Sequence, residues 1–251
     1  MDPIIVKDLL YKLADDQLIL GHRNSEWTGV GPVLEEDIAF SSMAQDKVGQ
    51  SQALYELLHK LGENEPDTVA FMRHADHFHN CLFVELPTKD YAFSLIRHFL
   101  FDFAEFIRFK MLMDSQYEPL AQLAAKIQGE IRYHVMHART FIKQLGSATE
   151  ESVTRLQGAL DYSMPYALGI FETSKYEDEI ISSGLFKGEE ALKSEWIKAI
   201  SDVVAQSSLK MPDISGMEAK TGGRYGTHTE HLQPLLDEMS EVFRQDPMAD
   251  W

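Results

Sequence analysis

The fold class is decided by residues 118–145, which read EPLAQLAAKIQGEIRYHVMHARTFIKQL. Apolar side chains in this stretch recur every three or four residues, the spacing that gathers them on one face of an α-helix. Pro119 stands near its start and Gly146 just past its end, as the asymmetry of helix ends favours. The spacing therefore predicts a long amphipathic helix over about 118–145.

The same period continues along most of the chain. It predicts further helices over about 4–22, 35–61, 90–114, 149–172, 188–206 and 229–244. The run from Thr221 to Gly226 predicts a turn, and Thr229 is the expected N-cap of the last helix. No stretch shows the alternation of apolar and polar residues that is typical of a strand. The sequence therefore predicts an all-α protein built as a helical bundle.

Composition narrows the range of functions. The 251 residues carry 23 Lys and Arg against 40 Asp and Glu, which gives a net charge of −17 at pH 7. Such a surface is repelled by nucleic-acid phosphates and by anionic membranes, so we expect neither as a partner. Cys81 is the single cysteine, which excludes an intrachain disulfide and a Cys-ligated cluster. The sequence shows no secretory signal and no apolar run long enough to span a bilayer, which predicts a soluble, cytoplasmic protein.

Acidic and histidine side chains on the expected helices raise the question of a metal site. Ferritin-like bundles bind two irons with a Glu from each of two helices and a Glu-x-x-His pair from each of two others. The three-residue offset places the carboxylate and the imidazole on one helical face. The candidate ligands here are Asp15, Asp46, Asp102, Glu105, Glu130 and His134.

The spacing departs from that ligand set at two positions. Gly49 follows Asp46 by three residues, where the pattern needs His, and Ile131 precedes His134 by three residues, where it needs Glu. We therefore expect no complete two-iron set, and we expect Gly49 and Ile131 to lie in a packed interior. Binding of a metal remains open as an alternative for Asp15, Asp102, Glu105, Glu130 and His134.

Structural roles compete with metal binding at the same residues. A carboxylate surrounded by Phe side chains, as Asp102 is, needs a cationic or hydrogen-bonding partner, for which His134 and Arg132 are the candidates. Asp46 is expected to pair with a cation in the same way, and His134 to be a hydrogen-bonded core histidine. A surface connector is expected for the neighbouring histidines His74, His77 and His79.

Five segments together carry a family resemblance over nearly the entire chain. They are 15–27 with Ser25-Glu26-Trp27, 34–39, 80–87 with Val84-Glu85-Leu86-Pro87, 130–134, and the tail from Thr221-Gly222-Gly223-Arg224 to His228-Thr229-Glu230-His231-Leu232. The tail motif is the most specific of them. On these segments the chain resembles the C subunits of the ring-1,2-phenylacetyl-CoA epoxidases, the PaaC-like group.

The resemblance implies a ferritin-like bundle with additional C-terminal helices. It implies a single domain over 1–251, with the core bundle over about 4–145 and the C-terminal helices and tail over about 149–251. It also implies a place in a bacterial multicomponent monooxygenase that epoxidises the aromatic ring of phenylacetyl-CoA in phenylacetate catabolism. At position 105 the family usually has a polar residue with a ring nitrogen, and Glu105 departs from that pattern.

The resemblance further implies how the work is divided within such a complex. A related A subunit holds the two irons, and a reductase with FAD and an iron–sulfur cluster supplies electrons. The PaaC-like chain is non-catalytic and holds no cofactor of its own. Its partners are the A subunit and the other subunits, including the reductase, and the isolated chain is a candidate homodimer.

Three functions therefore stay open: a structural oxygenase subunit, a metal-binding oxygenase, and a stand-alone helical binding module. The tail also has two interpretations. In the first, the last helix simply docks on its own bundle. In the second, the turn also contacts the catalytic subunit through Arg224, His228 and Glu230.

Overall fold

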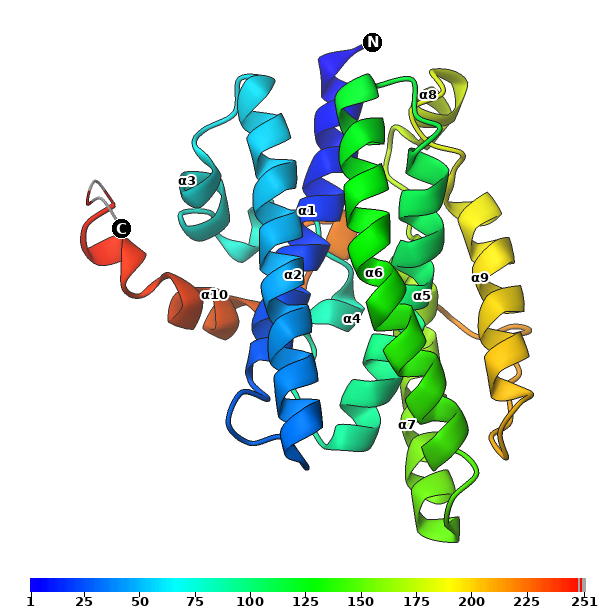
Figure 1. Cartoon of the computed structure of the whole chain (residues 1–251). Helices are drawn as coiled ribbons and strands as arrows, with labels where there is room; N and C mark the ends of the chain where they lie inside the picture. The colour runs from blue at the N-terminus through cyan, green and yellow to red at the C-terminus, as the bar shows by residue number, and fades with distance from the viewer. Residues whose placement is uncertain (248, 250–251) are drawn as a thin grey trace. The chain divides into compact units, whose positions relative to one another are not determined.

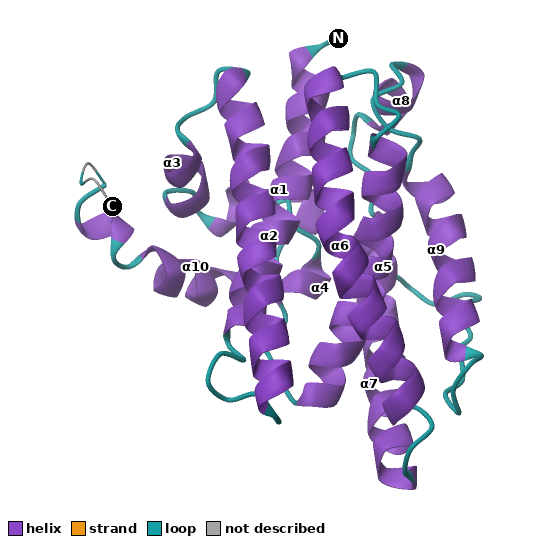
Figure 2. Ribbon diagram, in the orientation of Figure 1, coloured by secondary structure: helices purple, strands orange, loops and turns teal. Residues whose placement is uncertain are grey.

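The computed structural model describes residues 1–247 and 249, which form helices, turns and loops and contain no strand (Figure 2). The all-α class predicted from the helical period is confirmed. Helix α6 spans Glu118–Leu145, the range that the sequence predicts. Within the described ranges, no helix combines the length and the hydropathy that crossing a membrane requires.

The chain divides into two compact units, residues 1–87 with 222–251 and residues 88–221. The first unit contains α1 (Pro3–Ser25), α2 (Leu34–Lys60), α3 (Pro66–Phe71), α4 (Leu82–Glu85) and α10 (Leu232–Ser240), with 3-10 turns at Ala75–His77, Gly223–Tyr225 and Phe243–Gln245. The second contains α5 (Tyr91–Leu112), α6, α7 (Glu150–Leu168), α8 (Glu177–Ser182) and α9 (Glu189–Val204), with a 3-10 turn at Gly169–Phe171. The prediction that all 251 residues form one domain stays a prediction.

The first unit is built on the antiparallel pair α1 and α2 (Figure 1). Residues 12–21 of α1 are all buried, including the charged residues Lys12, Asp15 and Asp16. The two helices approach closely at Gly21, where an added Cβ would lie 3.0 Å from Cγ2 of Val48. A helix enclosed on every side needs a partner for each buried charge, so the packing of α1 dictates the contacts described below.

The second unit is built on the antiparallel pair α5 and α6, against which α7 and α9 also pack (Figure 1). Residues 93–105 of α5 are all buried, which agrees with its apolar, Phe-rich sequence. Trp196 of α9 is fully buried and donates from Nε1 to the carbonyl of Leu100 at 2.8 Å. Helix α5 is therefore the central helix of its unit, as α1 is in the other.

The end of the chain differs from the sequence prediction. Helix α10 begins at Leu232 with His231 as its N-cap and ends at Ser240, whereas the period predicts a helix over 229–244. The prediction that Thr229 caps this helix is wrong, because the helix begins three residues later. Oγ1 of Thr229 accepts from the N–H of His231 at 3.2 Å, and its hydroxyl donates to the Glu85 carboxylate at 2.9 Å. Leu232, Leu235 and Leu236 are buried as the period predicts, whereas Val242 is exposed, and the turn before the helix is held by a tertiary contact.

Candidate functional site

Asp15 is neutralised within the first unit. Its carboxylate accepts hydrogen bonds from the Arg73 guanidinium at 2.6 and 3.1 Å, from the Tyr55 hydroxyl at 2.5 Å and from the backbone N–H of His79 at 2.8 Å. These donors come from α2 and from the segment that follows α3. The positive charge of Arg73 and the three kinds of donor offset the cost of removing the carboxylate from water.

The environment of Asp15 also fixes its protonation state. Burial acts most strongly on this group and would raise its pKa, but the charge and hydrogen bonds of Arg73, with smaller effects of His79 and Tyr55, hold the pKa below its ordinary value. Tyr55 is affected in the opposite sense, because burial and the adjacent Asp15 charge raise its pKa. Asp15 is therefore ionised at neutral pH, and Tyr55 keeps its proton.

Asp16 ties α1 to the end of the chain. It accepts two hydrogen bonds from Arg224, at 2.9 and 2.7 Å, and a third from the backbone N–H of Cys81 at 2.7 Å. Arg224 also donates to the carbonyl of His79 at 2.7 Å. Cys81 is fully buried, and burial together with the nearby Asp16 charge raises the pKa of its thiol. Residues separated by more than 200 positions thus share one buried ion pair.

Glu85 at the end of α4 holds the same tail at a second point. Its carboxylate lies 3.1 Å from Nδ1 of His228 and accepts hydrogen bonds from the N–H and the hydroxyl of Thr229, at 3.1 and 2.9 Å. The backbone carbonyl of Glu85 accepts from Arg23 of α1 at 2.9 and 3.2 Å. The carboxylate is fully buried, so the tail supplies the polar partners that this site requires.

These contacts show where the three tail candidates lie. Arg224 and His228 point inward, toward Asp16 and Glu85, and fix the turn on its own unit. Glu230 is exposed, with 84% of its side-chain surface accessible. Of the three, Glu230 is the one that a partner can reach directly. Contact between this turn and a partner stays a prediction.

On α2, Lys47 and Gln50 form a pair of interior residues at the three-residue spacing. The sequence pattern predicts this pair one residue earlier, at Asp46 and Gly49. Lys47 is fully buried and donates from Nζ to Oε1 of Gln17 at 3.3 Å, and Gln50 is 2% exposed. Gly49 lies on the exposed face, where an added Cβ would meet nothing within 4 Å. The expectation of a packed interior is therefore wrong for Gly49, because a shift of one residue turns a helical position by about 100°. For Ile131 of α6, which is fully buried, it is confirmed.

Asp102 of α5 lies among buried histidines in the second unit. It is hydrogen-bonded to Nδ1 of His98, one turn earlier, and its second oxygen lies 3.7 Å from Nδ1 of His134. Nδ1 of His137 lies 3.3 Å from Nε2 of His98. Of the two predicted partners, His134 lies near Asp102 but beyond hydrogen-bond distance, and Arg132 is exposed. Sequence reasoning does not identify His98 as a partner of Asp102, although the two residues are four apart and so lie on the same helical face.

Burial lowers the pKa of His98 to about 4, although Asp102 favours the charged form. A neutral imidazole suits this geometry. Its Nδ1–H donates to Asp102, and its Nε2 is available as an acceptor for His137. His98 is therefore the neutral member of this network, and it donates to Asp102.

Glu105 is held by a protein cation one turn further along α5. Nε of Arg108 donates to Glu105 at 2.8 Å, and the same guanidinium donates to Glu189 at the start of α9. All three side chains are buried. Glu105, the residue that departs from the family pattern, thus belongs to a network in which Arg108 of α5 also pairs with Glu189 of α9.

The other candidate residues lie nearer the surface. Asp46 and Glu130 are half-buried on α2 and α6. His74 and His77 are exposed, as expected for a surface connector, but His79 is half-buried, with Nδ1 3.2 Å from the carbonyl of Arg224.

The side chains present do not fit a two-iron centre. Such a centre needs deprotonated carboxylates and neutral imidazoles that converge on the metal. Lys47 places an ammonium, and Gln50 an amide, on the inward face of α2 at the three-residue spacing. Asp15 and Glu105 accept hydrogen bonds from guanidinium groups. In the part of the chain that the structure describes, no three His, Cys, Asp or Glu residues are grouped as a metal ion would need.

Fold and site together define an all-α protein whose two central helices are held by buried carboxylates paired with Arg or His. The chain belongs to the phenylacetic acid catabolic protein family, whose model matches residues 5–251. It is similar to the C subunit of the 1,2-phenylacetyl-CoA epoxidase of Escherichia coli (strain K12), with 31% identity over 241 residues that cover 96% of this chain and 96% of that protein. The family resemblance read from the sequence is confirmed.

Proposed function

We propose that this chain is a non-catalytic structural subunit of a cytoplasmic, multicomponent 1,2-phenylacetyl-CoA epoxidase in aerobic phenylacetate catabolism. It supports a ferritin-like A subunit that holds the two irons, while a reductase with FAD and an iron–sulfur cluster supplies electrons. The similarity to the C subunit of an epoxidase, over 96% of both chains, supports the place in such a complex. The chain's own ferritin-like bundle is part of this proposal.

One observation supports the non-catalytic role: positively charged side chains neutralise the buried carboxylates. A divalent metal would neutralise the carboxylates that surround it, and here Arg73, Arg224 and Arg108 do so for Asp15, Asp16 and Glu105. Lys47 adds a buried positive charge on the inward face of α2, where a metal would be repelled. A subunit built in this way keeps its helices fixed without a metal and presents a rigid surface to a partner.

Metal analysis of the purified chain tests the proposal first. We expect far less than one iron per chain, because the ammonium of Lys47 and the guanidinium groups oppose a bound cation. The A subunit, purified in parallel from the same iron-supplemented cells, is the positive control. About two irons per chain would contradict the structural role and favour the oxygenase alternative.

Reconstitution with the A subunit and the reductase gives the second test. Asp102→Asn keeps the shape of the side chain and removes its charge, so it distinguishes catalysis from support. If the chain is structural, assembled complexes with Asp102→Asn turn over phenylacetyl-CoA with kcat within about twofold of the wild type. A fall in kcat of about 100-fold or more, at an unchanged yield of assembled complex, would show that Asp102 takes part in the chemistry. If the wild-type chain purifies without any A subunit, the stand-alone binding module gains support.

A further inference from the structure

The outer face of α2 carries a row of positions with a regular repeat, all exposed except the half-buried Ser41. Intervals of four, three, four and three residues separate the members of this α2 stripe, which are Leu34, Ile38, Ser41, Gln45 and Val48. Leu34, Ile38 and Val48 are 72%, 58% and 41% exposed, large fractions for aliphatic side chains. This repeat is the spacing by which one helix packs along another in a coiled coil, and the stripe extends over about 21 Å.

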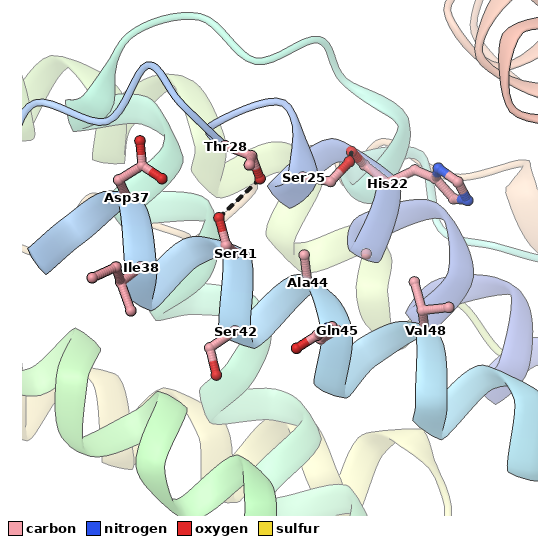
Figure 3. A pocket seen from close by; sticks show the side chains of 11 residues that line it. His22, Ser25, Thr28, Asp37, Ile38, Ser41, Ser42, Ala44, Gln45 and Val48 are labelled. Atoms are coloured by element: carbon pink, nitrogen blue, oxygen red, sulfur yellow. Dashed lines mark hydrogen bonds between the residues drawn. The ribbon is translucent and has the colours of Figure 1, made fainter. Parts of the chain in front are cut away.

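A groove of about 740 Å³ adjoins the stripe at the corner between α1 and α2 (Figure 3). Ile38, Ser41, Gln45 and Val48 line it together with Gly21, His22, Ser25 and Thr28. The hydroxyl groups of Thr28 and Ser41 lie 2.8 Å apart, which holds the loop after α1 against α2. In Figure 3, Ile38, Ser42 and Gln45 point away from His22, Ser25 and Thr28. The stripe and the groove are continuous, because they share Ile38, Ser41, Gln45 and Val48, and Asp37 adds a carboxylate to the lining.

Acidic side chains predominate around α2, and of them Glu26 is paired with Arg23 of α1 at 2.6 Å. Between Glu26 and Gln52, Lys47 is the only Lys or Arg in the sequence, and its side chain is fully buried. Glu26 and Glu35 are exposed, and Asp37 and Asp46 are half-buried. A second copy of the chain would bring acidic residues against acidic residues here, whereas a helix with basic residues beside an apolar row would be attracted.

We propose that the α2 stripe docks a helix of the catalytic A subunit, one that carries apolar side chains at the same repeat with Lys or Arg on its flanks. The inference rests on the proposed function and adds to it the surface and the chemistry of the partner. The aliphatic side chains of Leu34 and Ile38 supply the apolar contact area. The groove admits one large side chain of the partner beside Gly21 and Ser41. The surrounding acids favour basic flanks and disfavour self-association.

The test measures binding of the purified full-length chain to the A subunit of the same organism by titration calorimetry. The first variant is Leu34→Ser with Ile38→Ser, and the matched control is Met136→Ser with Ile181→Ser, which removes side chains 58% and 46% exposed on α6 and α8. The second variant, Glu35→Lys, reverses one charge beside the stripe. Circular dichroism and melting confirm that each variant is folded.

We expect Leu34→Ser with Ile38→Ser to weaken binding by on the order of tenfold or more, with the control unchanged. Glu35→Lys should weaken binding at low salt, and this difference should shrink at high salt. Wild-type affinity for the stripe variant would overturn the inference and leave the proposed function intact. Failure of the wild-type chain to bind the A subunit would overturn both. A homodimer of the isolated chain that the stripe variant dissociates would identify a second copy as the occupant and overturn the basic-helix partner.

Discussion

Arg224 belongs to the last 30 residues of the chain, yet its guanidinium neutralises Asp16 in the interior of α1. Replacing Arg224 with Ala leaves that carboxylate buried without its cation. We expect the free energy of unfolding to fall by about 3–5 kcal/mol, the range for breaking one side of a buried ion pair. Urea denaturation measures the change. Arg155→Ala is the control, because Arg155 and its partner Glu151 are largely exposed and such pairs contribute less than about 1 kcal/mol. Equal losses in the two variants would show that the Asp16 pair contributes no more than a surface contact.

His98 makes a second prediction at the level of one side chain. Its pKa is about 4 in the folded protein and about 6.5 in an unfolded chain. Between these values the unfolded state binds more protons, so the free energy of unfolding rises with pH through this window and is lost on acidification. The expected contribution to the slope is about 1.4 kcal/mol per pH unit for one proton. Asp15, whose pKa is lowered, adds a further loss of stability only at pH values below its ordinary range.

Denaturation of His98→Gln between pH 7 and pH 4.5 tests this assignment. The variant should lose the His98 part of the slope even if its stability at pH 7 is lower. His74→Gln is the control for replacing a histidine with glutamine, because His74 lies exposed on the surface. An identical slope in wild type and His98→Gln would mean that His98 keeps its ordinary pKa.

Among the elements, the turn between Gly223 and Gly226 requires glycine, because a side chain there would clash with the neighbouring backbone. Gly226 has φ +75°, and an added Cβ would lie 2.3 Å from the carbonyl oxygen of Asp76. Gly226→Ala should therefore lower the free energy of unfolding by about 2 kcal/mol or more, from left-handed backbone strain and the steric clash. The matched control is Gly49→Ala on the exposed face of α2, which should raise stability by up to about 1 kcal/mol through helix propensity. The two substitutions are expected to differ in sign in the same melting experiment, and equal effects would contradict this account of the turn.

The long helices could be predicted from sequence because each has enough turns for the apolar repeat to show. Helices α3, α4 and α8 span 6, 4 and 6 residues, too few for a 3.6-residue period, and they were missed. At the site, the sequence identifies Asp15 and Asp102 as acids on apolar faces. It does not identify Arg73 or Arg224, because those contacts arise from tertiary packing between distant segments. The sequence pattern places Asp46 inward on α2 because of its carboxylate, whereas the structure has Lys47 at the inward position.

At the scale of the whole molecule, the two units offer a test of the one-domain prediction. Hydrogen exchange of full-length Arg224→Ala should show faster exchange in α1, α4 and α10, whose unit contains the lost ion pair. If the units open separately, α5 and α6 keep wild-type protection. If protection falls equally in both units, the chain unfolds as one cooperative domain, as the sequence predicts.

The burial of the single cysteine gives the protein a built-in reporter. Cys81 is fully enclosed, its thiol keeps its proton because its pKa is raised, and an added Cβ on Gly223 would lie 3.4 Å from the Cα of Cys81. A thiol reagent can therefore label the chain only during moments when the packing around Cys81 opens. The labelling rate, compared with that of an unfolded peptide, measures the opening equilibrium of this part of the structure. Binding of any partner that stabilises the tail would slow the rate, so assembly could be followed from inside one subunit, with no engineered label.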